Sequence, residues 1–543
     1  MAGITRRSLL IGTGAVVLGA CTSSNGNKSG SAPKTSTTPS PIPGVTDEAF
    51  SLGVASGDPL PDGVLLWTRL APDPLHGGGM PDQPIPVEYE VAHDEAFKNV
   101  VRRGTSTATP ALAHSVHADV RGLDPGRDYF YRFRAGTALS PIGRARTAPA
   151  LQSSPARLRL AIANCQDFQN GYWPAFTAMA QEDLDFVLHV GDYIYEYDPK
   201  SKYADRKHTT PQTPGLDQLQ TLADYRARYS QYKLDPALQA VHTAFPMIAV
   251  WDDHEVENNY AGLIDELDKG AAHQDPQQFA QQRAHAYQAY YEHMPIRISY
   301  TQGSSNVRIY RQFNFGKLVS MPLLDTRQYR TDQPGGYGGD FGDARPGEQN
   351  TSGTLMGDAQ EAWLMDQLKS STATWNIIGQ QTMMAQLHGT ITPPTVLANM
   401  DDWDGYVPAR TRLLTKIRDA KIRNPVVLSG DFHTSFVNDL RVNFDQPDTP
   451  AVGAEFVSTS ISSSSLADEL GLPPTALEQL VPKFNPHIHY INAHQHGYTR
   501  IEVTPAQVQA DMRVVASIAT RQSPVSTDAS YVVADGKPGA QKA

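Results

Sequence analysis

The chain has 543 residues, which favours more than one domain, and its hydrophobic fraction of 40% excludes a largely disordered protein. A formal net charge of -11 argues against a nucleic-acid-binding surface, so specific nucleic-acid binding is not expected. The charge does not exclude anionic substrates, because a bound cation reverses the local field. No internal apolar stretch reaches the length needed to span a bilayer.

Residues 1–21 predict an export signal that ends in a lipid-attachment site. Thr5–Leu10 resembles a twin-arginine signal, and Leu18–Cys21 resembles a bacterial lipobox. The alternative is an ordinary signal peptide with a chance cysteine. A Ser/Thr/Pro-rich tether follows at residues 22–47. We therefore expect the twin-arginine translocase to export the protein, and lipid on Cys21 to be its only attachment to the outer face of the cell membrane.

The body of the exported protein contains a single cysteine, Cys165. It has no partner for an internal disulfide. A lone thiol in an oxidising compartment is a liability unless it is buried or bound to a metal. Cys165 is therefore a candidate metal ligand.

Residues 48–148 predict a small all-β domain. Val87–Val91 and Ser115–Val120 alternate apolar and polar residues, as half-exposed strands do. A turn at Asp124–Gly126 precedes a further strand at Tyr129–Phe133. The pattern predicts an antiparallel sandwich, and the turn with the strand after it resembles a fibronectin type III-like domain.

Residues 156–515 predict an α/β layered domain, because strand candidates alternate with helical segments. A long surface loop is expected at Gly335–Gly357, and a weakly patterned, partly mobile C-terminal tail at residues 516–543. The clearer helices are expected at Pro174–Asp183, Leu216–Leu234, Asp275–His293 and Asp358–Ser371.

Four short segments in this domain carry most of the chemistry. Each follows or closes an apolar run that reads as a buried strand. Because open α/β sheets bind ligands at the carboxyl ends of their strands, the four segments are expected to meet at one edge. In this order they predict a metal-dependent phosphoesterase. They are Asn164–Gln166, Gly191–Glu196, Trp251–Glu255 and Ser429–His433.

Phosphate-ester hydrolysis is well served by two metal ions that share one carboxylate and hold a hydroxide between them. Asp192 is our candidate for the shared carboxylate, since it follows a buried strand. Tyr195, three residues on, reaches the same ion if the chain turns, and tyrosine suits a hard trivalent ion. Cys165 as a thiolate is a second candidate ligand to that ion.

Three further residues supply ligands for a pair of ions. Asp431 and His433 are separated by one residue, so in an extended chain both side chains lie on the same face and serve adjacent metals. Asp253 is the candidate for the other ion.

The remaining candidates act on the substrate or complete a ligand shell. His254 is expected to be the general acid or to steady the phosphoryl group. Arg327 is either a phosphate clamp or part of an ion pair with a residue such as Asp325. Asn258 and Asn259 either complete a calcium shell or form a turn.

These segments resemble the PhoD family of secreted alkaline phosphatases. Leu324–Arg330, Asp402–Tyr406, Gly53–Pro59 and Leu66–Arg69 resemble it too, so the likeness covers roughly residues 50–504. It implies phosphomonoesterase activity, with phosphodiesterase activity in some members. It also implies a centre similar to that of purple acid phosphatases, with ferric iron and calcium.

Carried over by motif, the resemblance assigns ligands to both ions. Oxygen-rich ligation of the second ion suits calcium, although zinc or manganese remains the alternative. Iron would take Cys165, Asp192, Tyr195 and His433. Calcium would share Asp192 and take Asp253 and Asp431. Asn258, which the resemblance does not assign, is a further candidate ligand to calcium.

Five other histidines are expected to have structural roles. His189 lies on a buried strand and is predicted to be a satisfied core residue. Metal binding is the less favoured reading for the histidines of residues 486–499, namely His487, His489, His494 and His496.

Several readings of the function stay open. The first is a monomeric alkaline phosphatase acting on small phosphorylated substrates. The second is a phosphodiesterase acting on phospholipid in the manner of phospholipase D, on teichoic acid or on nucleotides. A third, of another class, is a lipid-anchored protein that binds phosphorylated ligands without catalysis, and a fourth is a degenerate, inactive relative.

Overall fold

The computed structural model describes residues 40–210, 218–265, 275–334, 341–389, 396–446 and 448–543. The predicted export signal, the lipobox and most of the tether lie outside these residues. Residues 41–543 form one compact unit. Within the described segments, none of the helices combines the length and the apolar character that crossing a bilayer requires.

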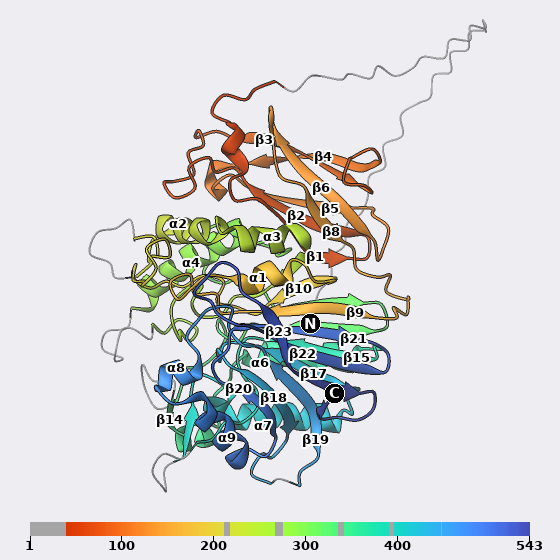
Figure 1. Cartoon of the computed structure of the whole chain (residues 1–543), viewed down its shortest axis with the longest axis vertical. Helices are drawn as coiled ribbons and strands as arrows, with labels where there is room; N and C mark the ends of the chain where they lie inside the picture. Colours follow the sequence, from red (N-terminus) through yellow and green to blue (C-terminus); the bar gives the residue numbers. More distant parts are fainter. Residues whose placement is uncertain (1–39, 211–217, 266–274, 335–340, 390–395, 447) are drawn as a thin grey trace, which may run out of the picture. The chain divides into compact units, whose positions relative to one another are not determined.

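Two large mixed sheets dominate the unit (Figure 1). The ten-stranded sheet has the order β24 (Gln541–Lys542), β23 (Val525–Ala534), β22 (Gln507–Val515), β21 (Gly497–Val503), β9 (Leu158–Ala163), β10 (Phe186–His189), β11 (Pro246–Ala249), β1 (Val54–Leu60), β2 (Gly63–Arg69) and β5 (Ser115–Arg121). The seven-stranded sheet has the order β12 (Arg311–Phe315), β13 (Val319–Leu323), β15 (Trp375–Gly379), β17 (Pro425–Ser429), β19 (Ala451–Val457), β18 (Ser435–Arg441) and β20 (Ile488–Asn492).

Helices flank these sheets, as the sequence predicted. The four expected helical segments each contain one, although α1 and α2 are shorter than expected and α3, α7 and α9 were not foreseen. Thr221 and Asp224 form a capping box at the start of α2, which fixes where that helix begins. The helices are α1 (Pro174–Met179), α2 (Leu222–Lys233), α3 (Pro236–Ala244), α4 (Pro276–His293), α5 (Arg345–Gln349), α6 (Gly357–Ser370), α7 (Val407–Asp419), α8 (Leu466–Leu470) and α9 (Pro474–Phe484).

The two large sheets share one apolar core. Phe186 of β10 stacks on Phe315 of β12 with ring centroids 4.9 Å apart, which joins one sheet to the other. A second core lies between the seven-stranded sheet and helices α6 and α7, where Leu364 and Leu413 are fully buried. Burial on both faces explains why these strands read as continuous apolar runs.

The N-terminal strands form a sheet of their own and also extend the large one. The five-stranded sheet contains β4 (Val100–Ala108), β3 (Ile85–Ala92), β6 (Asp128–Ala135) and β7 (Ala138–Leu139), with β8 (Gly143–Arg146) paired to β6. It shares a core with β2 and β5. However, β1 pairs in parallel with β11, so hydrogen bonding continues from residues 48–148 into the following domain. A fibronectin type III-like identity stays a prediction.

Two expectations about irregular segments are wrong. Of the loop expected at Gly335–Gly357, residues 335–340 lie outside the described structure, but β14 (Phe341–Asp343) pairs with β16 (Leu397–Asn399) and α5 follows. The C-terminal residues are not a weakly patterned tail, because β23 pairs along its length with β22. The β14–β16 pairing joins segments that are distant in sequence, whereas β22 and β23 are consecutive strands.

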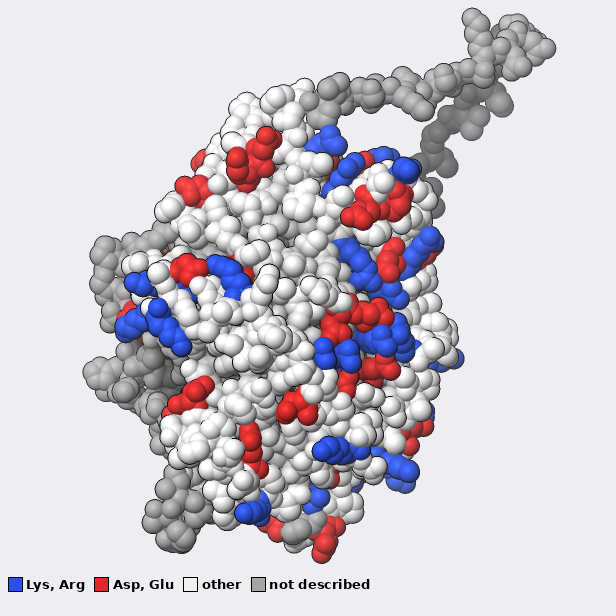
Figure 2. Space-filling view, in the orientation of Figure 1, with Lys and Arg blue, Asp and Glu red and all other residues white. Residues whose placement is uncertain are grey.

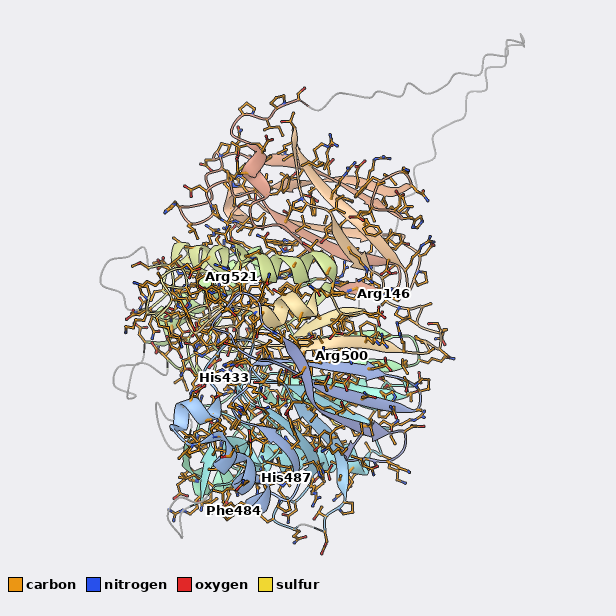
Figure 3. The ribbon with its side chains drawn as sticks, in the orientation of Figure 1. Arg146, His433, Phe484, His487, Arg500 and Arg521 are labelled. Carbon is orange, nitrogen blue, oxygen red and sulfur yellow. The ribbon has the colours of Figure 1, made fainter. Side chains whose placement is uncertain are left out.

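Ion pairs join charged side chains of the strands to segments beside them. Arg500 of β21 contacts Asp511 of β22 and Glu182, both at 2.8 Å. Arg146, labelled with Arg500 in Figure 3, pairs with Asp185 at 2.8 Å. On the face seen in Figure 2, basic and acidic groups accordingly lie side by side, without one large field of a single sign.

A buried ion pair fixes β1 beside β11. Asp58 is 2% exposed and accepts hydrogen bonds from Arg311 at 2.7 and 2.9 Å and from the Arg297 N–H at 2.6 Å. Asp58→Asn is expected to lower the free energy of unfolding by about 3 kcal/mol, because it leaves a buried guanidinium without its counter-charge. Denaturant unfolding measures this.

Asp62→Asn is the matched control, since Asp62 is 62% exposed beside Arg121. Its expected cost is below about 0.5 kcal/mol. Equal losses in the two variants would contradict the role assigned to the Asp58 pair.

Candidate metal centre

The predicted segments meet where parallel strands of both sheets end. β10 runs parallel to β9 and β11, and β17 runs parallel to β15 and β19. Asn164 links the two sheets here, because its amide donates to the carbonyls of Ser458 and Thr459 after β19. Strands far apart in sequence therefore place their following residues at one site.

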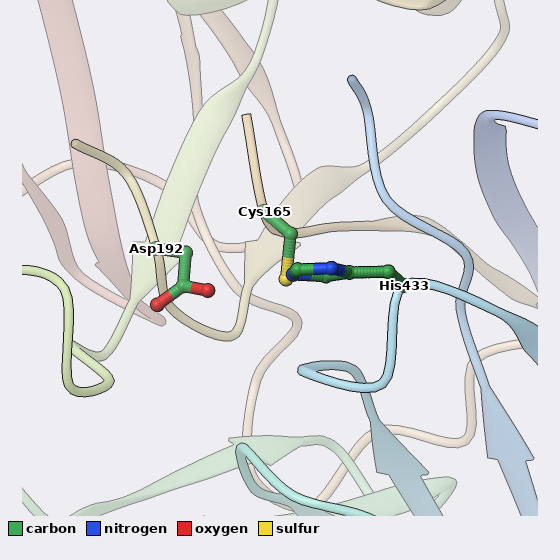
Figure 4. Close-up of side chains that lie close together, drawn as sticks. All are labelled: Cys165, Asp192 and His433. Carbon is green, nitrogen blue, oxygen red and sulfur yellow. The ribbon is translucent and has the colours of Figure 1, made fainter. Parts of the chain in front are cut away.

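One group of donor atoms contains the residues predicted for a trivalent ion. Atoms of Cys165, Asp192 and His433 lie within 4.8 Å of one another (Figure 4). The Tyr195 hydroxyl is 3.0 Å from Asp192 Oδ2 and 3.3 Å from His433 Nε2. The four side chains are thus close enough to surround a single ion.

A second group contains carboxylates only. Donor atoms of Asp192, Asp252, Asp253 and Asp431 also lie within 4.8 Å of one another. Asp192 belongs to both groups, which is the position a bridging carboxylate needs. Asp252 was not among the predicted residues, although it stands directly before Asp253 at the same strand end.

Two oxygens in these groups suit a cation. Asp192 Oδ1 and Asp253 Oδ1 are buried and accept no hydrogen bond from the described residues. Buried polar atoms are normally satisfied, and an unsatisfied one costs free energy. Oxygen ligands of this kind are what calcium prefers, so the residues fit a metal centre.

The chemistry of the first group depends on removing protons. Burial, assisted by Asp192, raises the pKa of the Cys165 thiol and of the Tyr195 phenol well above their ordinary values. Burial also raises the pKa of Asp192. A cation must therefore displace protons from these groups when it binds.

The backbone is in the left-handed conformation at several of the proposed metal ligands, which sets the direction of their side chains. Cys165, Asp192, Asp431 and His433 all have φ between 54° and 64°. Residues other than glycine avoid this region, and such conformations cluster at functional sites. Gly191 has φ of 124°, and a side chain there would collide with Asp252. The chain is thus turned sharply where the ligands project.

Glu255 ties two of the strand ends together. Its carboxylate accepts the backbone N–H groups of Asp192 at 3.1 Å, Tyr193 at 2.7 Å and Asp252 at 2.7 Å. It is fully buried. Glu255 belongs to a predicted segment, but its role in holding the segment after β10 follows only from the structure.

His254 is held by a carboxylate. Its Nδ1 is 2.8 Å from Glu196 Oε2, and Glu196 Oε1 accepts the Asn258 N–H at 2.8 Å. Burial opposes the charged form, but Glu196, Asp253 and Asp192 together raise the pKa of His254 well above its ordinary value. The imidazolium is therefore favoured.

Arg327 does not line the cavity at this site, and its role as a phosphate clamp stays a prediction. The side chain is fully buried, with Nη1 2.6 Å from Asp401 and Nε bonded to Asp252. Nη2 lies 3.5 Å from Asp431 and 3.7 Å from Asp253. Arg327 is a counter-charge beneath the carboxylates; Asp325 accepts its backbone N–H at 3.1 Å but does not pair with its guanidinium.

The two asparagines lie near the second group. Asn258 lines the cavity, and its Oδ1 accepts a hydrogen bond from Tyr197 at 3.3 Å. The Asn259 N–H donates to Asp253 Oδ2 at 2.7 Å, which orients that carboxylate. Ligation by Asn258 stays a prediction.

A cavity of about 660 Å³ opens above the two groups. Its size is within the range of small-molecule sites. Cys165 and Asp192 are buried at its base, each 1% exposed. The predicted residues that line it are Tyr195, Asp253, His254, Asn258, Asp431 and His433.

The other histidines have partners elsewhere. His189 is fully buried and 3.2 Å from Gln166 Oε1, as expected of a core residue. His487 contacts the Gln386 carbonyl at 2.7 Å and lies away from His433 (Figure 3). Of the donor clusters that the described residues form, none includes His487, His489, His494 or His496.

Comparison with known proteins agrees with this arrangement. The family model for PhoD-like phosphatases matches residues 160–512, and that for the N-terminal domain of these phosphatases matches residues 36–149. The chain belongs to the PhoD-like phosphatase family. The resemblance inferred from the four segments is thereby confirmed.

Individual relatives in the PhoD-like family are close. Alkaline phosphatase D of Bacillus subtilis (strain 168) is 45% identical over 503 residues, which is 92% of this chain and 83% of that protein. The solved structure of PhoD aligns with a TM-score of 0.83 and 43% identity, covering 94% of this chain and 93% of that one. The chain is thus a homologue of alkaline phosphatase D.

Removing the cations from this PhoD-like protein is expected to lower its melting temperature, and more so at higher pH. Asp192 and Asp431 have raised pKa values, chiefly through burial. In the metal-free protein these carboxyl groups contribute fully to the free energy of unfolding below their pKa in the unfolded chain, and this contribution is lost as the pH rises through their pKa in the folded protein. Bound cations reverse this by pairing with the ionised forms.

Calorimetry of chelator-treated and metal-replete protein at several pH values measures the effect. Asp192→Asn is the control, since it removes one carboxylate and should weaken the pH dependence of the metal-free protein. A difference in melting temperature between the metal-replete and the metal-free protein that stays constant or becomes smaller as pH rises would contradict this prediction.

Proposed function

We propose that the chain is an exported, metal-dependent phosphoric-ester hydrolase acting on phosphomonoesters and, as a second substrate class, phosphodiesters. The observation that carries this is Asp192, which two donor groups share at the base of an open cavity. One carboxylate between two cation sites is the arrangement that phosphoryl chemistry uses. A protein that only binds phosphate would not need it.

Ferric iron and calcium are the proposed cations. Cys165, Asp192, Tyr195 and His433 would hold iron, because thiolate and phenolate suit that ion. The second site offers mainly carboxylates, with His254 within reach of Asp192 and Asp253 and with Asn258 nearby, and this oxygen-rich set favours calcium over zinc or manganese. When bound, the pair neutralises phosphoryl oxygens and makes a water nucleophilic near neutral pH.

The chain's own residues supply the proton for the leaving oxygen. His254 lines the cavity with Nδ1 bonded to Glu196, and Nε2, 3.4 Å from the Tyr197 hydroxyl, is the nitrogen that would face the substrate. Glu196, which contributes most to the raised pKa of His254, favours the protonated form that a general acid must have. Arg327, from below, spaces the carboxylates.

Substrate class and location are proposed on separate grounds. The cavity of about 660 Å³ opens to solvent, which leaves room for a second substituent on the phosphate. This supports activity on small phosphorylated compounds and on lipid or wall-polymer diesters. Export by the twin-arginine route and a lipid anchor at Cys21 rest on the N-terminal sequence alone.

Hydrolysis of p-nitrophenyl phosphate and of its bis ester tests the proposal. Asp192→Ala is expected to lose both cations and essentially all turnover, since it serves both sites. His254→Ala is expected to keep the cations and lose about 10²–10⁴-fold in kcat, the usual contribution of a general acid. Metal analysis and kcat are measured on the same samples.

His489→Ala is the matched control, because His489 pairs with Asp439 outside the cavity. It should leave kcat unchanged. Full metal content and activity in Asp192→Ala would show that the bridge is misplaced. No turnover of either ester by metal-replete wild type would favour the binding-protein reading.

Glu196→Gln tests how His254 is oriented. Loss of the carboxylate charge 2.8 Å from Nδ1 should make the protonated form of His254 less stable. We therefore expect kcat to fall about 10-fold while KM changes little. An unchanged kcat would show that Glu196 does not orient His254 for catalysis.

A further inference from the structure

A serine-rich loop wraps the thiolate side of the centre. Residues 458–465 connect β19 to α8 and read Ser-Thr-Ser-Ile-Ser-Ser-Ser-Ser. Ser458, Ser460, Ser462 and Ser463 are each at most 2% exposed. Buried hydroxyls cost free energy unless they are hydrogen-bonded, so their partners show what the loop does.

The backbone of the loop holds two of the proposed iron ligands. The N–H groups of Ser462 and Ser463 both donate to the Cys165 carbonyl at 3.2 Å. The Ser464 carbonyl is 2.8 Å from His433 Nδ1, so it accepts that N–H and turns Nε2 toward Tyr195. These contacts fix the Cys165 turn and the tautomer of His433.

One side chain of the loop reaches a donor atom. Ser463 Oγ lies 2.6 Å from the Tyr195 hydroxyl and 2.9 Å from the Cys165 carbonyl. Two backbone N–H groups already satisfy that carbonyl. The Ser463 hydroxyl accepts the Asp167 N–H at 3.3 Å, and its single proton has two acceptors within reach, of which the Tyr195 oxygen is the nearer.

We propose that loop 458–465 positions three of the four iron-side ligands, and that Ser463 is the positioning residue which holds the Tyr195 oxygen. The inference rests on the proposed function, since it takes Tyr195 as a ligand. Residues that hydrogen-bond to a metal ligand orient that ligand and alter the properties of the metal. Their loss typically lowers metal affinity or activity by about 10–100-fold.

Ser462, the neighbouring serine, serves to distinguish a role in positioning a ligand from a role in packing alone. Ser462 Oγ donates to the Asp167 carbonyl at 2.7 Å and accepts from Trp173 Nε1 at 3.0 Å. It is as buried as Ser463 and lies in the same loop, but its hydroxyl contacts none of the proposed ligand atoms. Ser462→Ala is therefore the matched control.

The experiment compares wild type, Ser463→Ala, Ser463→Thr and Ser462→Ala as purified, metal-replete full chains. Iron content, melting temperature, the visible phenolate-to-iron band and kcat/KM are measured. A hydrogen bond stabilises the phenolate electron pair, so Ser463→Ala should move the band to longer wavelength, keep its iron and lose about 10-fold in kcat/KM. Ser463→Thr should restore both, while Ser462→Ala should lower the melting temperature without moving the band.

Each other outcome counts against the inference. A band at the wild-type position in Ser463→Ala, or the same shift in Ser462→Ala and Ser463→Thr, overturns it. Loss of iron in both alanine variants would show that the loop acts only in folding. A colourless, iron-free wild type contradicts the ferric assignment as well, and the wild-type sample alone reveals that.

Discussion

The repulsion among buried carboxylates is the constraint on which the structure depends. Asp192, Asp252, Asp253 and Asp431 bring their oxygens within 4.8 Å of one another; the first three are buried, and Asp431 is partly exposed to the cavity. At that distance two carboxylates repel by about 3 kcal/mol for an effective dielectric constant of about 20. Six such pairs exceed the roughly 5–15 kcal/mol by which a domain is stable. The ionised group therefore needs cations.

The fold provides some counter-charge of its own, through Arg327, which does not line the cavity, and through His254, which does. Arg327 lies beneath the carboxylates and His254 beside them, and both favour their ionised forms. The upper side faces the cavity and is left for metal ions. The same arrangement explains the backbone strain at the ligands, since Glu255 and the serine loop hold turns that isolated residues would avoid. Stability, metal binding and catalysis thus share one set of contacts.

Local sequence predicted the parts of this site that depend on strand ends. Apolar runs such as Leu158–Ala163 mark buried strands, and Cys165 and Asp192 follow them directly, so their meeting at one edge could be expected. Long-range pairing could not be expected in the same way. The union of β1 with β11 and the burial of Arg327 depend on partners distant in sequence. Ser463 was missed because a serine run has no signature for a ligand-orienting role.

Anomalous scattering at the iron absorption edge, from crystals of the protein purified without chelator, tests the central claim most directly. The account predicts an iron peak among Cys165, Asp192, Tyr195 and His433. It predicts a second cation, without an iron edge, between Asp192, Asp253 and Asp431. One cation alone, or no iron at the thiolate site, would contradict it.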